Sequence, residues 1–156
     1  MLITRIAGCL AMVLVSSTIL LAQPSEPLRH NLVDLQGLIP DLVVDMPYAT
    51  SQNFTGETLY PANRAFLVMP AAAALASAAE LLRAQGYRLK ILDAYRPLSV
   101  QRKLWEKNPD CNFVAHPSTG SRHNRGASVD LTLVTMAGAE IEMPSQYDEF
   151  GAKAGA

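Results

Sequence analysis

An α+β fold is predicted for this chain, with a single antiparallel sheet that carries helices on one face. Three patterns favour it: a helical apolar stripe over residues 69–85, strand-like apolar runs over 87–93 and 128–134, and a possible hairpin return over 140–143. The sequence contains neither the regular β-α-β order nor the Gly-rich phosphate loop of a doubly wound fold. The length of 156 residues fits one domain.

The chain before the first long helix is expected to hold little regular structure. Residues 23–40 contain prolines and follow no clear period, which indicates an irregular segment. Residues 41–48 carry several neighbouring apolar side chains and are predicted to form a strand. Residues 49–64 are rich in Ser, Thr, Asn, Gly and Pro, which predicts a loop.

The helix over residues 69–85 has the clearest signals at both ends. Pro70 fits the first turn, where a missing backbone N–H is tolerated, and the alanines that follow have high helix propensity. Gly86 is expected to end the helix in the left-handed conformation. A second helix is predicted over residues 99–107, and a polar loop over 108–125 follows it.

Composition and charge exclude several classes of partner. Hydrophobic residues make up 49% of the chain and charged residues 17%, which is an ordinary globular balance. The formal net charge is −1, so electrostatics favours neither nucleic acid nor an anionic membrane surface as a partner. The two cysteines, Cys9 and Cys111, are too few for a disulfide framework.

Residues 1–22 differ from the rest of the chain. Arg5 is their only charge, and an apolar run over residues 6–22 follows it, as in a secretory signal peptide. Cleavage after Ala22 would leave residues 23–156 as one exported domain, expected in the periplasm, without a stable membrane partner. An uncleaved membrane anchor is the alternative, although the run is short and polar residues interrupt it.

The stretch from Ser121 to Asp130 carries the most chemistry. It joins a polar loop, which contains His123, to an apolar strand in which Asp130 lies between Val129 and Leu131. Burying a carboxylate there is costly unless it is paired or binds a metal, and imidazole and carboxylate are both natural zinc ligands. The alternative is a hydrogen-bonded structural aspartate beside an unrelated surface histidine.

Two further charged positions are candidates for binding. Arg96 follows a predicted strand, where functional side chains are common, and its guanidinium suits an oxyanion or a substrate carboxylate. The alternative is an ordinary surface pair between Arg96 and Asp93. Asp148 and Glu149 could contact a cationic group, although carboxylates in such a segment are usually solvated.

These segments together, in this order, resemble the VanX-type D-alanyl-D-alanine dipeptidases. These are zinc peptidases that share a fold with D,D-carboxypeptidases and the Hedgehog signalling domain. The resemblance runs from about residue 31 to residue 150. It is carried by Asn53-Phe54-Thr55-Gly56, Asp93-Ala94-Tyr95-Arg96-Pro97, Ser121-Arg122-His123-Asn124-Arg125-Gly126-Ala127-Ser128-Val129-Asp130, and Tyr147-Asp148-Glu149-Phe150.

The resemblance implies a role for each matching residue. His123 and Asp130 match the first two ligands of one Zn²⁺ per chain, and Arg96 matches the arginine that stabilises the transition state. Asp148 matches the carboxylate that receives the amino group of the dipeptide D-Ala-D-Ala, and Ser121 is a weaker substrate contact. The implied reaction releases two D-alanine molecules during turnover of cell-wall peptide.

One departure from the family pattern concerns the catalytic base. The family carries a Glu-x-x-His near its C-terminus, whose Glu is the general base and whose His is the third zinc ligand, and this sequence contains no such motif. The domain is therefore expected to be truncated at its C-terminal end. His116, which lies as far before His123 as Asp130 lies after it, is an alternative third ligand, although its setting is more typical of a surface loop.

Two rival functions remain open at this point. The chain could be a catalytically inactive fragment or remnant of the family, because the Glu-x-x-His segment is missing. It could instead resemble a D,D- or L,D-carboxypeptidase of the same fold. Asp148 argues against the second rival, since longer peptides do not need a residue that binds a free amino terminus.

Overall fold

The computed structural model describes residues 31–151, so the predicted signal segment over residues 1–22 lies outside the described residues. The elements follow in the order β1 (Leu32–Asp34), α1 (Leu35–Leu38), β2 (Val43–Val44), the 3₁₀ turn η1 (Pro47–Ala49), β3 (Phe66–Val68), α2 (Met69–Arg83), β4 (Tyr87–Asp93), α3 (Leu98–Lys107), the 3₁₀ turn η2 (His123–Arg125) and β5 (Asp130–Thr135). Within this part of the chain, no helix is long and apolar enough to cross a membrane.

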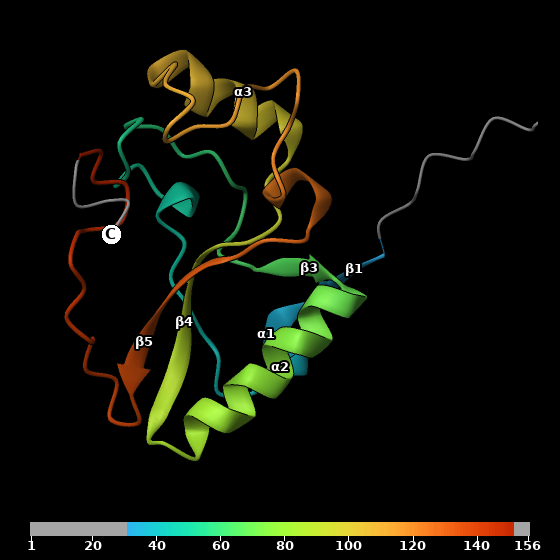
Figure 1. Cartoon of the computed structure of the whole chain (residues 1–156), viewed down its shortest axis with the longest axis vertical. Coiled ribbons are helices and arrows are strands. Elements are labelled where there is room, and N and C mark those ends of the chain that lie inside the picture. Colours follow the sequence, from blue (N-terminus) through green and yellow to red (C-terminus); the bar gives the residue numbers. More distant parts are fainter. Residues whose placement is uncertain (1–30, 152–156) are drawn as a thin grey trace, which may run out of the picture.

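The α+β class is confirmed: helix α2 lies along β4, and α3 lies at one end of the molecule, as Figure 1 shows. The sheet itself differs from the expectation of one antiparallel layer. A two-stranded antiparallel sheet joins β1 to β3, and a separate three-stranded sheet has the order β2-β4-β5. In the second sheet β4 and β5 are antiparallel, whereas the short β2 runs parallel to β4.

The core lies between α2 and one face of β4. Leu89 and Ile91 alternate along β4 and are buried, because successive side chains of a strand point to opposite faces. Leu75 and Ala79 supply the matching buried stripe of α2, one helical turn apart. Burial of these apolar side chains therefore fixes how the helix lies on the strand, and β4 ends at the site described below.

The predicted helices and strands of the second half of the chain are largely confirmed. Helix α2 ends two residues before the predicted bound, β4 has the predicted bounds, and α3 begins one residue earlier. Gly86 has φ +88°, in the left-handed region where glycine is favoured, and its N–H donates to the carbonyl of Arg83.

The first half of the chain departs more from expectation. The predicted strand over residues 41–48 is reduced to β2, because Pro47 cannot donate to a sheet and begins η1 instead. The segment expected to be irregular contains β1 and α1, whose first turn Asp34 caps by accepting from Gln36 N. Beyond β5, the predicted return over 140–143 is limited to an isolated bridge between Val134 and Glu140.

Candidate active site

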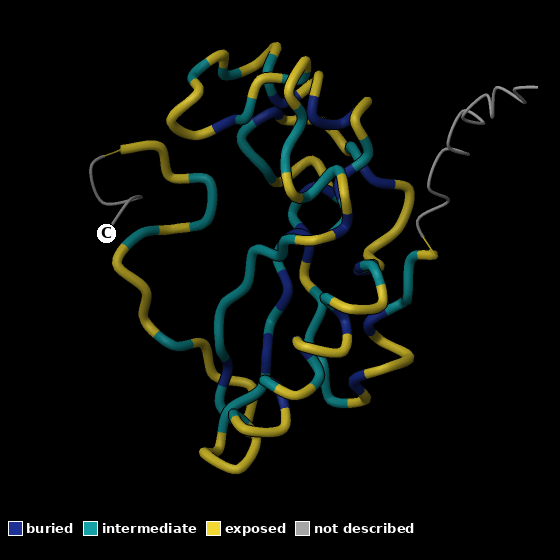
Figure 2. The backbone as a smooth tube through the Cα atoms, turned by 45° about the vertical axis from the view of Figure 1, so that its right-hand side comes forward, coloured by how far each residue is buried: buried dark blue, intermediate teal, exposed yellow. Residues whose placement is uncertain are grey.

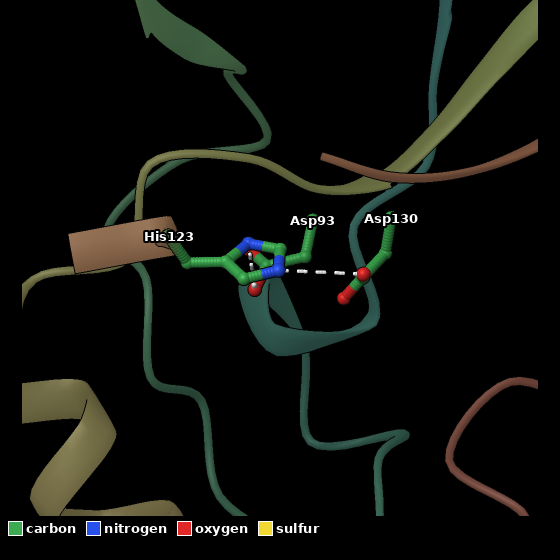
Figure 3. Close-up of side chains that lie close together, drawn as sticks. All are labelled: Asp93, His123 and Asp130. Atoms are coloured by element: carbon green, nitrogen blue, oxygen red, sulfur yellow. Dashed lines mark ion pairs between the residues drawn. The ribbon is translucent and has the colours of Figure 1, made fainter. Parts of the chain in front are cut away.

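His123 and Asp130 meet because a tight turn joins η2 to β5. Gly126 has φ +64° and closes η2. A Cβ at this position would lie 2.9 Å from Leu32 Cδ2 and 3.2 Å from the backbone nitrogen of Val68, so the turn packs directly against β1 and β3. The turn brings His123 Nε2 to 3.4 Å from Asp130 Oδ1, as Figure 3 shows.

The imidazole of His123 is held in one orientation. Its Nδ1 lies 2.9 Å from the carbonyl oxygen of Ala94, which can only accept, so Nδ1 carries the hydrogen. Nε2 is therefore left to face Asp130. Burial opposes a charge on the ring, but the hydrogen bond and the charge of Asp130 outweigh it and raise the pKa of His123. An imidazole nitrogen and a carboxylate oxygen this close together could also hold a divalent cation in place of a proton.

Asp93 is the third acidic or imidazole group within reach, and its ligating atom lies within 4.8 Å of those of His123 and Asp130. Its two oxygens are already engaged. Oδ1 accepts from Tyr60 Oη at 2.7 Å and from the backbone nitrogen of Ala94 at 2.9 Å. Oδ2 accepts from Arg96 Nε at 2.8 Å and lies 2.6 Å from Arg96 Nη2. Asp93 is thus the counter-ion of Arg96 and not a free metal ligand.

This ion pair is buried, which corrects the alternative of an ordinary surface pair. Asp93 is 0% exposed and Arg96 is 8% exposed. Burial disfavours the charge on Arg96, but the coulombic attraction of Asp93 outweighs it and keeps the pKa of Arg96 above its usual value. The guanidinium therefore stays charged, and its Nη2 lies 3.7 Å from Asp130 Oδ2, beside the two candidate metal ligands.

Asp148 reaches the same region through two tyrosines. Tyr48 Oη donates to Asp148 Oδ1 at 2.9 Å, and Tyr147 Oη donates to Asp130 Oδ2 at 3.3 Å. Burial raises the pKa of Asp148 to about 6, against the opposing hydrogen bond from Tyr48. Its Oδ2 is buried and has no hydrogen-bond partner within residues 31–151. Asp130 and Asp148 are both among the residues that line one open cavity.

Among the described residues, neither Ser121 nor His116 makes a hydrogen bond to this cluster. The backbone nitrogen of Ser121 donates to Asn124 Oδ1 at 2.7 Å, and its hydroxyl accepts from Asn124 N at 3.3 Å. His116 Nδ1 lies 2.7 Å from Ser118 Oγ, and its ring packs edge-on against Trp105. His116 accordingly lies in a loop, as the surface-loop interpretation expects, and makes no hydrogen bond to the cluster among the described residues.

Sequence reasoning missed three polar residues that shape the site. Tyr48 and Tyr60 are buried aromatics whose hydroxyls bond Asp148 and Asp93. Gln101 is fully buried in α3, and its Oε1 accepts from Arg96 Nη1. Tyr48 and Asp148 are separated by 100 residues, so no local pattern links them. Of the three, Gln101 could have been found from the sequence, because it is a polar residue on the apolar side of a predicted helix.

Comparison with known proteins places the chain in a family. The family model Peptidase_M15, described as "D-ala-D-ala dipeptidase", matches residues 29–156. The chain is 39% identical over 119 residues to a D-alanyl-D-alanine dipeptidase of Escherichia coli, which covers 76% of this chain and 62% of that protein. It is 31% identical over 125 residues to one of Enterococcus faecium, with 67% and 62% covered. A third, from Streptomyces coelicolor, is 32% identical over 127 residues, with 67% and 61% covered.

The match extends over most of this chain but not over the whole of its relatives. The chain spans about three fifths of the length of the curated relatives it matches. The matched residues include every member of the cluster formed by Asp93, Arg96, His123, Asp130 and Asp148. On this match, and with a group of side chains that could hold a metal ion, the chain belongs to the Peptidase_M15 family of D-Ala-D-Ala dipeptidases.

Proposed function

We propose that this protein hydrolyses D-Ala-D-Ala to two D-alanine molecules in a zinc-dependent reaction. One observation carries the proposal. In a chain of the D-Ala-D-Ala dipeptidase family, His123 Nε2 and the guanidinium of Arg96 converge on the carboxylate of Asp130, at 3.4 Å and 3.7 Å. A metal-ligand pair beside a fixed cation is what peptide-bond hydrolysis through a tetrahedral intermediate requires.

His123 and Asp130 are the residues that would hold one Zn²⁺ per chain. Their donor set, an imidazole nitrogen and a carboxylate oxygen, suits zinc. The Nδ1 hydrogen bond of His123 to the Ala94 carbonyl is the outer contact that fixes the orientation of a ligating imidazole. When bound, zinc would lower the pKa of a water molecule and polarise the scissile carbonyl.

Arg96 is proposed to stabilise the oxyanion of the tetrahedral intermediate. Its charge is retained despite burial, because Asp93 is its counter-ion. The side chain is held before substrate arrives, so little reorganisation is needed as negative charge develops in the transition state. A proton acceptor for the attacking water is not assigned to any residue of this chain, whose sequence contains no Glu-x-x-His.

Asp148 is proposed to bind the amino group of the dipeptide. Its Oδ1 accepts from Tyr48, whereas Oδ2 is buried and has no hydrogen-bond partner within residues 31–151, so it could pair with an ammonium group if the segment moves to admit one. A carboxylate that binds the amino terminus restricts the substrate to dipeptides, which disfavours the carboxypeptidase rival. Ser121 is proposed as a weaker contact to the substrate.

The proposed setting is the periplasm, where the enzyme would recycle D-Ala-D-Ala released from the cell wall. The apolar run with a single arginine in residues 1–22 motivates this proposal, with residues 23–156 as the exported domain. Cell fractionation and N-terminal sequencing test it. We expect a periplasmic protein that begins at Gln23, and recovery of the full chain from the cytosol contradicts export.

A second candidate function is binding of wall dipeptide without hydrolysis. The observation that favours it is the engagement of both oxygens of Asp93, which leaves only two free donors, His123 Nε2 and Asp130, in the candidate metal cluster of residues 31–151. A catalytic zinc normally has three protein ligands.

One experiment separates the two candidates. Zinc stoichiometry, D-Ala-D-Ala binding and D-alanine release are measured on the purified chain, with L-Ala-L-Ala as the matched control. Zinc-dependent release from the D,D-dipeptide alone supports the hydrolase, and saturable binding without release supports the binding function. Neither binding nor release contradicts both.

A further inference from the structure

Gln101 connects the guanidinium of Arg96 to the loop at Ala115, which follows α3 in the chain. Its side chain is 0% exposed, and both ends of its amide are engaged. Oε1 accepts from Arg96 Nη1 at 3.0 Å, and Nε2 donates to the carbonyl oxygen of Ala115 at 2.7 Å. A buried amide is stable only when it is hydrogen-bonded, so these two bonds explain why a polar group is tolerated here.

The helix fixes where Gln101 can point. Val100 and Leu104, its neighbours on the inner face of α3, are 5% and 1% exposed and belong to the core. The helix backbone is tied to the preceding turn, because the backbone nitrogen of Gln101 donates to the Pro97 carbonyl at 3.1 Å. The amide therefore has no route to solvent without moving α3, and its position is set by packing that does not depend on Arg96.

Arg96 is held from two directions. Its Nε and Nη2 contact Asp93, and Nη1 donates to Gln101, so three of its roughly five N–H donors are committed to the protein. The two contacts with Asp93 set the plane of the guanidinium. The hydrogen bond from Nη1 to Gln101 prevents the guanidinium from tilting out of that plane. The donor left on Nη2 lies on the side of Asp130 Oδ2, 3.7 Å away.

The chemistry of the residue matters as well as its place. Asp93 already supplies one negative charge to Arg96. A neutral amide adds a second restraint without a second negative charge, so the guanidinium keeps its attraction for an oxyanion. The other end of the amide holds Ala115, in the loop that leads to Ser121 and His123. One side chain thus joins the arginine to the loop that carries a metal-ligand candidate.

We infer that Gln101 is a positioning residue, which orients the Arg96 guanidinium toward the His123–Asp130 pair and joins it to the loop at Ala115. This inference rests on the proposed function for its catalytic consequence but not for its structural part. Gln101→Met removes both side-chain hydrogen bonds with little change of volume. Gln101→Glu keeps an acceptor for Arg96 and removes the donor to Ala115. Arg102→Gln, on the exposed side of α3, is the matched control.

The first test measures the guanidinium directly by ¹⁵N NMR on the full chain. A guanidinium held at both Nη atoms rotates slowly and has separate Nη1 and Nη2 signals. We expect separate signals for Arg96 in the unchanged chain, in Arg102→Gln and in Gln101→Glu, and a single averaged signal in Gln101→Met. Averaged signals in the unchanged chain or in Gln101→Glu would overturn the inference, even if Gln101→Met does not fold.

The second test uses hydrolysis kinetics, with thermal unfolding of each variant as a check of folding. In Gln101→Met we expect kcat for D-Ala-D-Ala to fall by about tenfold with KM within about twofold, because the lost alignment acts in the transition state. An unchanged kcat in a folded Gln101→Met overturns the inference and leaves the proposed hydrolase standing. If the unchanged chain itself releases no D-alanine, the proposed hydrolase fails, and the NMR result alone decides the role of Gln101.

Discussion

The two halves of the candidate site are held in different ways. The inner half, with Asp93, Arg96, His123 and Asp130, lies where β4, η2 and β5 meet, and its side chains bond to one another and to backbone. The outer half is the segment of residues 143–151, which contains no buried residue and follows the open margin of the molecule in Figure 2. It is attached mainly through aromatic side chains.

This difference suggests a division of roles. Chemistry needs fixed geometry, so the proposed metal ligands and the proposed oxyanion donor are expected on rigid elements, as the inner half provides. Asp148 in the outer half has φ +60°, which is unusual for a residue other than glycine and is held by its neighbours. Substrate must enter and leave, and a segment that few contacts hold can open at small cost. On the proposed function, the inner half would serve catalysis and the outer half binding, and Asp130 and Asp148 bring the two halves to one cavity.

The largest effect is expected when the inner ion pair is broken. Asp93→Ala leaves the charge of Arg96 buried without a counter-ion, which should lower the free energy of unfolding by about 3–5 kcal/mol. Urea denaturation measures this loss. Asp41→Ala, which removes a partner of the exposed Arg83, is the control and should have little effect. If the two losses are similar, the inner half is not the more tightly held one.

A smaller loss of stability is expected from Gly126→Ala. The new Cβ would require φ +64° and would lie 2.9 Å from Leu32 Cδ2, so both strain and collision act, and about 2–3 kcal/mol should be lost. Gly56→Ala is the matched control, because Gly56 has φ +72° but no atom within 4 Å of the added Cβ. Thermal unfolding should give Gly56→Ala the smaller loss, and equal losses would show that the close packing of the turn contributes nothing.

The outer half should respond in binding more than in stability. Phe150 packs on Phe54 and Phe113, with ring centroids 4.9 Å and 5.3 Å apart. Phe150→Ala should lower the free energy of unfolding by only about 1 kcal/mol and raise KM for D-Ala-D-Ala while kcat changes little, because Asp148 loses its support. Met143→Ala, at an exposed apolar position of the same segment, is the control. A fall in kcat at constant KM would place this segment in the chemical step instead.

The same contrast separates what the sequence predicts from what it does not. His123 and Asp130 belong to one local stretch, so a tight glycine turn and a strand suffice to bring them together. The α2 helix and β4 strand follow from periodicity because their apolar faces bury each other. Local patterns of this kind predict the structure well, because burial in the folded protein favours the same helix and strand that the local sequence favours.

Contacts between residues far apart in the chain cannot be predicted from local sequence patterns. The surface pair considered for Asp93 and Arg96 is buried, and it contacts both Tyr60, from a distant part of the chain, and Gln101, from the helix that follows. Nothing in the sequence around Asp93 indicates that a tyrosine 33 residues away will donate to its carboxylate. The short strand β1 was not predicted, and β2 is shorter than its predicted strand, because pairing with a partner strand defines such short elements more than their own residues do.

The smallest effect at neutral pH is expected from the titration of Asp148. Its pKa is raised by burial from 3.8 to about 6, so the folded chain binds a proton that the unfolded chain releases between these values. This contribution to stability is fully present below about pH 4 and is lost as the pH rises to about 6, above which the stability no longer depends on Asp148 titration.

Dipeptide binding should depend on pH in the opposite direction, because an ammonium group needs the carboxylate, and the affinity should rise as the pH passes 6. Calorimetry of D-Ala-D-Ala binding from pH 5 to pH 8 measures this, with Asp148→Asn as the control that lacks the titrating group. Equal slopes in both proteins would mean that the amino group binds elsewhere, and the outer half would then lose its proposed role in substrate recognition.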